Sequence, residues 1–206
     1  MQGKEGIRVM KVILASGSPR RKELMEKAGL EFEVIPAECE EVIDPALTAE
    51  ETVMSLASRK ASWVAENEKD KRRDKTIVIG ADTVVVLDGK ILGKPKDKAD
   101  AFSMLRALSG REHEVYTGVA LISPDGKINE TFSECTKVKF RSLSDQEIEE
   151  YIATDEPNDK AGAYGIQGLG RRLVEETIGD YNNVVGLPVE ALMKRIAGIK
   201  DEQYKE

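Results

Sequence analysis

The sequence has very few of the side chains that build the common metal and nucleophile sites. It has 206 residues but a single histidine, His113, which excludes histidine-rich zinc sites and the H-E-x-x-H motif. A Ser-His-Asp triad would have to use His113, and no nucleophile-elbow motif accompanies it. The two cysteines, Cys39 and Cys135, lie far apart without metal-ligand spacing. We therefore expect reduced thiols, as in proteins that work inside the cell.

Long apolar runs, a secretory signal and a basic charge balance are also missing. No apolar run approaches the length needed to cross a bilayer. The net charge of −7 argues against a protein held on nucleic acid by bulk electrostatics. Neither G-x-G-x-x-G after a strand nor a Walker A sequence occurs. The sequence therefore predicts a cytoplasmic protein that binds neither nucleic acid nor a membrane.

What is present is the composition of a folded domain. Apolar residues make up 40% of the chain and charged residues 33%, values typical of soluble globular proteins. The length is enough for one domain, or two closely joined lobes, with a real core. We expect a single domain over residues 1–206, in which the polar residues 1–9 form a flexible extension.

The most informative stretch is V-I-L-A-S-G-S-P-R-R at residues 12–21. It predicts a buried strand, a turn of small residues and a helix with Ser18 at its N-cap and proline at its first position. Arg20 and Arg21 would then lie beside the positive end of the helix dipole, which costs stability unless an anion is bound. A polyphosphate fits, because backbone N–H groups, the hydroxyls of Ser16 and Ser18 and the guanidiniums converge there. Two solvated arginines at a helix start are an equally supported alternative.

The next candidates are a lysine on a helix and an acidic loop before it. Thr48 and Glu51 predict a capping box for a helix that runs to about Glu66. Lys60 falls on the apolar face of this helix, where it either snorkels to water or points into a cleft and binds an anion. The loop at residues 38–41 holds three carboxylates, which are usually solvated surface and only in a minority of cases bind a metal or substrate.

An aspartate interrupts the most apolar segment of the chain, residues 76–87, which predicts a strand long enough to serve two lobes. A buried carboxylate such as Asp82 is costly unless it is paired, hydrogen-bonded or bound to a cation. We favour a general base or metal ligand facing a cleft; a structural ion pair with an arginine or lysine is the alternative. Lys94 follows the hairpin that returns from this strand. Gln167 lies in the glycine-rich segment 159–170, where its amide could read one edge of a base, although such loops are more often plain turns.

Together these residues favour the hydrolysis of a polyphosphate. The candidates are four cations and two carboxylates: Arg20, Arg21, Lys60, Lys94, Asp82 and Glu41. A nucleoside triphosphate carries about four negative charges at neutral pH, which the cations and a divalent metal would neutralise. Carboxylate oxygens would hold that metal, and one carboxylate would activate water.

Eight short motifs stand in order along the chain: A-S-G-S-P-R-R (15–21), L-A-S-R-K-A (56–61), G-A-D-T-V-V (80–85), G-K-P (93–95), S-G (109–110), Y-T-G-V (116–119), D-K-A-G-A-Y-G-I-Q-G (159–168) and N-V-V-G-L-P (183–188). In this order they resemble the Maf family of nucleoside triphosphate pyrophosphatases, which are nucleotide house-cleaning enzymes. The resemblance implies an α/β fold with a long twisted mixed sheet, flanking helices and a deep cleft between two lobes. It also implies cleavage between the α and β phosphates with a divalent cation, Mg²⁺ or Mn²⁺.

The resemblance assigns roles to residues that match the family's motifs. It implies that Asp82 is the proton acceptor for an attacking water, and that Glu41, with Asp82, lies near the metal or that water. The residues implied to contact phosphates are Ser16, Arg20, Arg21, Lys60 and Lys94. Those implied to select the base are Arg20, Thr83 and Gln167. The motif versions at residues 81–83 and 159–162 are similar to those of the branch that acts on dTTP, UTP and modified pyrimidine triphosphates.

Two alternatives remain open from the sequence. The first is a nucleotide-sensing regulator of septation and cell-division arrest that binds without turnover, although a sensor has no need for a carboxylate such as Asp82. The second is a pyrophosphatase that removes purine analogues such as ITP and XTP. A homodimer is expected from the family resemblance alone, since no apolar stripe in the sequence demonstrates one.

Overall fold

The computed structural model describes residues 10–68 and 75–203, and a single mixed sheet forms its centre. The strands are β1 (Lys11–Leu14), β2 (Glu33–Val34), β3 (Thr76–Leu87), β4 (Lys90–Leu92), β5 (Glu112–Ile122), β6 (Asn129–Phe140) and β7 (Val174–Ile178). Their order is β2-β1-β3-β5-β6-β7, and β4 pairs with β3. The pairs β2-β1 and β1-β3 are parallel and the others antiparallel. The expected α/β fold with a mixed sheet flanked by helices is confirmed.

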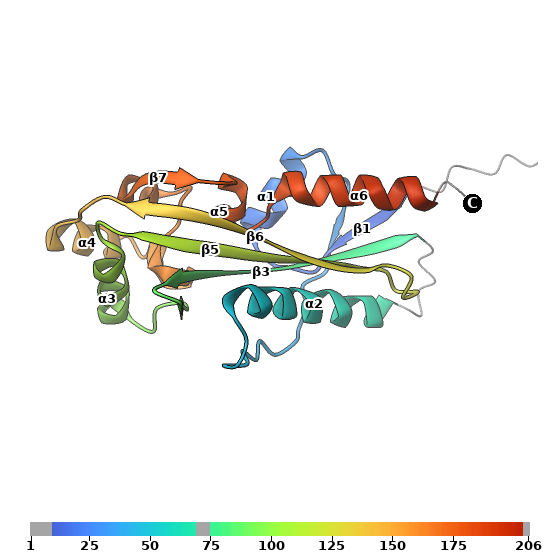
Figure 1. The fold of residues 1–206 in the computed structure, drawn as a ribbon, viewed down its shortest axis with the longest axis horizontal. Coiled ribbons are helices and arrows are strands. Elements are labelled where there is room, and N and C mark those ends of the chain that lie inside the picture. The colour runs from blue at the N-terminus through green and yellow to red at the C-terminus, as the bar shows by residue number, and fades with distance from the viewer. Residues whose placement is uncertain (1–9, 69–74, 204–206) are drawn as a thin grey trace, which may run out of the picture.

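Three long strands, β3, β5 and β6, run along most of the molecule and connect its two ends (Figure 1). Helix α2 (Ala49–Glu68) lies on one side of them, and α1 (Pro19–Lys27), α5 (Tyr181–Val185) and α6 (Val189–Gln203) lie on the other. Helices α3 (Lys98–Leu108) and α4 (Asp145–Ile152) lie at the end opposite to α6, near the short 3₁₀ turns η2 (Glu156–Asp159), η3 (Ala161–Ala163) and η4 (Leu169–Leu173). No helix in the described ranges is long and apolar enough to cross a membrane.

Local signals in the sequence place several of these elements. The hydroxyl of Thr48 accepts from the backbone N–H of Glu51, whose carboxylate accepts from Thr48 in return, which is the predicted capping box at the start of α2. A second capping box opens α4, and the side chain of Asp97 caps α3. The turn between β3 and β4 has positive φ at both central residues, 51° at Asp88 and 72° at Gly89, as a type I′ hairpin requires.

Helix α2 packs unusually close to the sheet because glycines face it. A Cβ atom on Gly80 would lie 2.2 Å from the carbonyl oxygen of Ala57, and one on Gly118 would lie 2.3 Å from that of Val53. Both distances are too short for any side chain larger than hydrogen. A glycine inside a strand leaves space for a close approach, and at Gly80 the approaching group is the backbone of α2.

The sheet has a gap beside β3, and this gap positions the candidate site. Strand β1 pairs with residues 76–79 of β3, and β4 pairs with residues 85–87. Between them, residues 80–84 pair with β5 alone among the described strands. Because successive side chains of a strand point to opposite faces, neighbours on this stretch reach both sides of the sheet. The segment after β1 and the segment after β4 border the gap.

Three local expectations differ from the structure. The residue pattern at 32–36 predicts a strand, but β2 has only two residues. The residues at 181–183 predict a turn, but they form the start of helix α5. Helix α2 continues to Glu68, two residues beyond its expected end. The run of charged residues at 66–75 predicts a solvated connector, and residues 69–74 of it lie outside the described residues, as does the expected extension at residues 1–9.

Candidate active site

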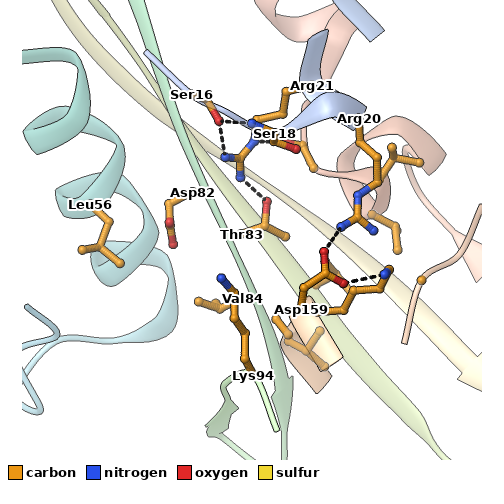
Figure 2. Close-up of a pocket in the computed structure, with 18 of the residues that line it drawn as sticks. Ser16, Ser18, Arg20, Arg21, Leu56, Asp82, Thr83, Val84, Lys94 and Asp159 are labelled. Atoms are coloured by element: carbon orange, nitrogen blue, oxygen red, sulfur yellow. Dashed lines mark hydrogen bonds and ion pairs between the residues drawn. The ribbon is translucent and has the colours of Figure 1, made fainter. Parts of the chain in front are cut away.

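A cavity of about 690 Å³ opens at the gap in the sheet. Its walls come from the segment after β1, from α2, from the middle of β3, from the β4 strand and the residues after it, and from the loop between η2 and η4 (Figure 2). All ten residues predicted for the site line this one cavity: Ser16, Ser18, Arg20, Arg21, Glu41, Lys60, Asp82, Thr83, Lys94 and Gln167. The structure thus brings together residues that are up to 151 positions apart, from Ser16 to Gln167. Their individual roles stay predictions.

Lys60 lies between the two candidate carboxylates. Its Nζ is 2.6 Å from Asp82 Oδ1 and 2.5 Å from Glu41 Oε1. The side chains of Lys60 and Asp82 are each only 12% exposed, so Lys60 points into the cavity instead of snorkelling to water. The hydrogen bond from Lys60 is the main reason that the pKa of Glu41 lies below its ordinary value, with further lowering by the charges of Lys60, Lys94 and Arg21. Both carboxylates are therefore held beside a cation at the cavity wall.

The structure also decides which acidic residue of the loop reaches the cavity. Glu41 lines the cavity and contacts Lys60, whereas its neighbour Glu40 is exposed and is not among the lining residues. Asp82 also forms an ion pair with Lys60, which is the kind of partner expected if Asp82 had only a structural role. Asp82 Oδ2 has no hydrogen bond to the described part of the protein, so one carboxylate oxygen is not used by that pair.

The donor set fits a hard divalent cation that arrives with a phosphorylated ligand. Glu41 and Asp82 supply carboxylate oxygens, which Mg²⁺ and Mn²⁺ prefer. Among the described residues, no group of three or more His, Cys, Asp and Glu side chains could hold a metal ion by itself. Magnesium commonly binds to one or two carboxylates together with substrate phosphates and water. Two carboxylates at the wall of a cationic cavity match that mode.

Arg21 is held in the cavity wall by three hydrogen bonds to the protein. Its Nε donates to Gly186 O at 2.8 Å. Its Nη1 donates to Ser16 Oγ at 3.1 Å and its Nη2 to Thr83 Oγ1 at 3.2 Å (Figure 2). Burial lowers the pKa of Arg21, while the charges of Asp82 and Glu41 act in the opposite direction. All three acceptors are uncharged oxygens, so no described carboxylate is hydrogen-bonded to this guanidinium. Such a group favours an anion in the cavity.

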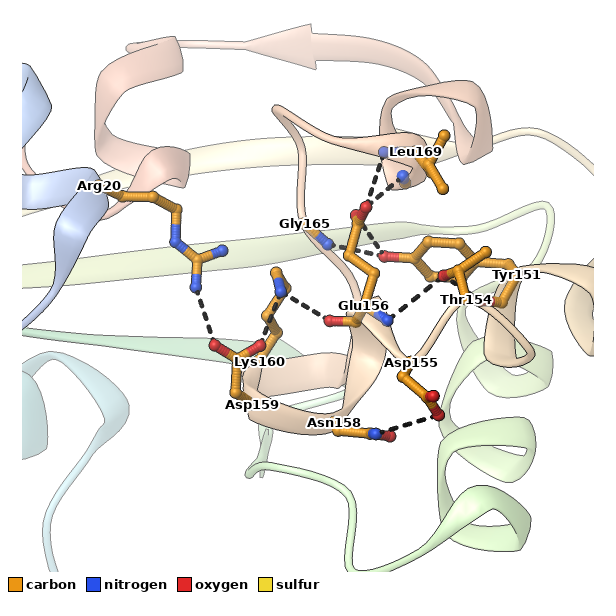
Figure 3. A network of polar contacts seen from close by, with 11 residues as sticks. Arg20, Tyr151, Thr154, Asp155, Glu156, Asn158, Asp159, Lys160, Gly165 and Leu169 are labelled. Atoms are coloured by element: carbon orange, nitrogen blue, oxygen red, sulfur yellow. Dashed lines mark hydrogen bonds and ion pairs between the residues drawn. The ribbon is translucent and has the colours of Figure 1, made fainter.

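Arg20 points away from Arg21 and toward the far wall of the cavity. Its Nη2 lies 3.6 Å from Asp159 Oδ2, and Asp159 Oδ1 accepts from Lys160 Nζ at 2.7 Å (Figure 3). The pair with Asp159 therefore connects the start of α1 to the C-terminal end of η2. The sequence placed both arginines at one helix end; the structure shows that they diverge, because adjacent helical residues point about 100° apart.

The serines and the glutamine take positions that suit a ligand. Ser18 stands at the N-cap of α1, but its side chain makes no capping hydrogen bond; the backbone N–H of Ser18 donates to Ser16 Oγ at 3.3 Å. The Ser18 hydroxyl is therefore not needed by the helix that it begins. Gln167 is exposed and lies between η3 and η4 on the cavity wall.

A buried hydrogen-bond relay beneath the site was missed by the sequence analysis. Thr117 on β5 is 0% exposed; its hydroxyl donates to Asn183 O at 2.9 Å and lies 2.9 Å from Thr83 Oγ1. Because the Thr117 proton goes to a carbonyl, the Thr83 proton must go to Thr117, which leaves Thr83 only lone pairs for Arg21. The sequence signal that could have indicated this relay is Thr117 itself, a polar residue on the buried face of a strand.

The fold and the cavity together define an α/β protein whose cationic, carboxylate-bearing cleft suits a phosphorylated ligand. A family model described as Maf-like protein matches residues 11–199. The chain therefore belongs to the Maf family, and the resemblance noted in the sequence is confirmed.

Curated relatives match nearly the whole chain. A dTTP/UTP pyrophosphatase of Bacillus cereus (strain ATCC 10987 / NRS 248) is 52% identical over 193 residues, which cover 94% of this chain and 92% of that protein. A dTTP/UTP pyrophosphatase of Bacillus anthracis (strain CDC 684 / NRRL 3495) is 53% identical over 186 residues, covering 90% and 94%. The crystal structure of a nucleoside-triphosphatase / dITP/XTP pyrophosphatase from Mycobacterium abscessus covers 93% of this chain and 97% of its own, at 16% identity and a TM-score of 0.42. That likeness is too low to bear on fold or function.

Proposed function

We propose that this protein is a nucleoside triphosphate pyrophosphatase that hydrolyses dTTP, UTP and modified pyrimidine triphosphates to the monophosphate and pyrophosphate. The observation that carries the proposal is a single cavity of about 690 Å³ whose wall holds the mostly buried carboxylate of Asp82 together with five cationic side chains, the four predicted ones and Lys160. The names of relatives that are 52% and 53% identical support the choice of dTTP and UTP.

The cations would neutralise and orient the triphosphate. Arg21 keeps two of its five N–H donors for the ligand after its three hydrogen bonds to the protein, and Lys94 and Arg20 add charge from the other walls. The Ser16 and Ser18 hydroxyls would bond phosphate oxygens beside the first turn of α1, where backbone N–H groups also favour an anion. Charge neutralisation and positioning supply most of the acceleration in phosphoryl transfer.

Asp82 would act as the general base. Lys60 holds Oδ1 at 2.6 Å, so Oδ2 is the oxygen that would accept a proton from water. The oxygen of that water would form a bond to the α phosphorus while the bond from this phosphorus to the bridging oxygen breaks, and pyrophosphate leaves. Glu41 and Asp82 would hold Mg²⁺ or Mn²⁺ together with the phosphates. Such an ion, when bound, would neutralise the charge that develops on the leaving group.

The direct test measures pyrophosphate release from a panel of nucleoside triphosphates with Mg²⁺ and with chelator. We expect release from dTTP and UTP that stops on chelation, and none from 7-methyl-GTP or ITP. Binding of dTTP without release would favour the nucleotide-sensing regulator of septation. Release from ITP and XTP in preference to pyrimidines would favour the purine-analogue enzyme. The homodimer and the cytoplasmic location stay predictions.

Variants separate the catalytic role of Asp82 from its ion pair. Asp82→Asn should lower kcat by orders of magnitude while the chain stays folded, because asparagine has similar volume but accepts no proton at neutral pH. Glu41→Gln should also lower activity, whereas the adjacent Glu40→Gln is the matched control and should not. Turnover like that of the wild type in Asp82→Asn would overturn the proposed mechanism.

A further inference from the structure

The loop that carries Gln167 is held by a carboxylate that lies outside the cavity lining. Glu156, the first residue of η2, accepts at Oε2 from the backbone N–H of Leu169 at 2.8 Å and at Oε1 from that of Gly170 at 3.1 Å (Figure 3). Leu169 and Gly170 begin η4 immediately after the loop. One carboxylate therefore fixes the C-terminal end of the segment that contains Gln167.

The N-terminal end of the same segment is held by Tyr151 from helix α4. The Tyr151 hydroxyl accepts from the backbone N–H of Gly165 at 3.1 Å and donates to Glu156 Oε1 at 2.9 Å. The Tyr151 ring is fully buried among the core residues. Burial and the neighbouring carboxylate raise the pKa of this phenol, so it stays protonated and keeps donating. Tyr151 and Glu156 thus form a clamp on both sides of Gln167.

Glycines allow the loop to lie directly on this clamp. A Cβ atom at Gly168 would lie 2.4 Å from Glu156 Oε2, and one at Gly170 would lie 2.7 Å from the Tyr151 hydroxyl. At Gly170 a Cβ would also lie 2.5 Å from the backbone oxygen of Gly165, so the loop packs directly on Glu156, Tyr151 and itself at these two glycines. This close packing accounts for part of the glycine pattern, for which the sequence left a plain turn and a ligand loop open.

Gln167 is the uncharged amide that this clamp presents to the cavity. Its side chain is exposed, lines the cavity, and has no described hydrogen bond of its own. An amide offers one donor and one acceptor side by side, which can pair with an N–H and a carbonyl on a pyrimidine ring. Pairing of this kind discriminates between bases only if the amide is held in place, since a mobile side chain adapts to either.

We propose that Glu156 is a positioning residue for base selectivity, acting through Tyr151 and the loop backbone to hold Gln167 at the cavity wall. The inference rests on the proposed function. Three donors converge on the carboxylate: two backbone N–H groups and a phenol. A carboxylate accepts all of them, whereas the amide of a glutamine would turn its NH₂ group toward at least one donor. Glu156→Gln therefore loosens the loop with almost no change in volume.

The experiment compares the ratio of kcat/KM for UTP to that for CTP in wild type, Glu156→Gln, Gln167→Ala and the double variant. We expect Glu156→Gln to lower this ratio at least fivefold. The factor by which kcat for UTP falls should be smaller than the factor by which the ratio falls. The double variant should be no less selective than Gln167→Ala alone, because both changes remove the same contact. Glu149→Gln on the exposed side of α4 is the matched control and should leave the ratio unchanged.

An unchanged ratio in Glu156→Gln, or additive losses in the double variant, overturns the inference. If Glu156→Gln fails to fold, Tyr151→Phe keeps the buried ring and removes one side of the clamp, and the same change in the ratio is expected. The ratio of affinities for UTP and CTP in the presence of Mg²⁺ gives the same comparison without turnover. If the wild type binds these nucleotides but releases no pyrophosphate, the proposed function is wrong. The role of Glu156 is then decided by the ratio of affinities alone.

Discussion

The contact between Gly80 and α2 offers a direct test of how the fold positions the site. Gly80 does not have a positive φ, so alanine is allowed there by the backbone and only the space decides. An added Cβ would lie 2.2 Å from Ala57 O and 2.8 Å from Ala61 N. Ordinary contacts begin near 3.4 Å, so α2 would have to move outward by roughly 1 Å. Both opposing atoms are backbone, which cannot rotate away.

We expect Gly80→Ala to destabilise the protein by about 3 kcal/mol, the upper part of the range for overpacking, because the obstacle is a rigid helix. In urea this corresponds to a midpoint about 1.5 M lower, for an unfolding slope of about 2 kcal/mol/M. Displacement of α2 also draws Lys60 away from Asp82, whose Oδ1 is 2.6 Å from Lys60 Nζ. We therefore expect a loss of pyrophosphate release even where Gly80→Ala is still folded.

The matched control is the same substitution at Gly198 in α6. A Cβ there meets no atom of the described residues within 4 Å, and alanine is favoured over glycine inside a helix by about 0.5–1 kcal/mol. Gly198→Ala should therefore raise the midpoint while Gly80→Ala lowers it, as measured by urea unfolding of both variants and wild type. A Gly80→Ala protein with the stability and activity of the wild type would refute the proposed role of this close packing.

Two further predictions concern the cavity wall and the core. Arg21→Lys keeps the charge but cannot bond Gly186, Ser16 and Thr83 at once, so KM for dTTP should rise at least about tenfold; steady-state kinetics with an unchanged KM would contradict this. Burial lowers the pKa of His113 from 6.5 to about 4 in the folded protein. Between these two pH values the unfolded chain therefore binds one proton more than the folded chain. The free energy of unfolding should fall by about 3 kcal/mol as the pH drops from 6.5 to 4. Urea unfolding across this range should show the slope in wild type and a flatter one in His113→Phe, since the chain has no other histidine; equal slopes would contradict it.

Much of the fold was predictable because its signals are local. The strand at residues 76–87, the capping boxes at Thr48 and Ser144 and the turn at Asp88 and Gly89 are all found in the structure. Each depends on neighbours within about four positions, and such signals can be read without knowing the fold. The motifs at residues 15–21 and 159–168 identified the family for a related reason, since their order along the chain is specific.

The contacts inside the site were not predictable, because they join distant segments. Nothing near Arg20 indicates that its partner is Asp159, nor does anything near Arg21 indicate Gly186. The interpretation of Asp82 shows the same limit. The sequence offered an ion pair and a site in a cleft as alternatives, yet Asp82 both pairs with Lys60 and lines the cavity.

The gap between β1 and β4 explains why residues from so many motifs meet at one place. Strand β3 continues past the end of β1 and reaches β4 only at Val85, so Asp82 and Thr83 lie where none of the described strands covers the sheet edge. Their side chains leave opposite faces: Asp82 meets Lys60 of α2, and Thr83 meets Arg21 of α1. A ligand in the gap can therefore contact both faces of the sheet at once. Had β1 or β4 been longer, ladder hydrogen bonds would fill this edge, so the shortness of these two strands is itself a requirement of the site.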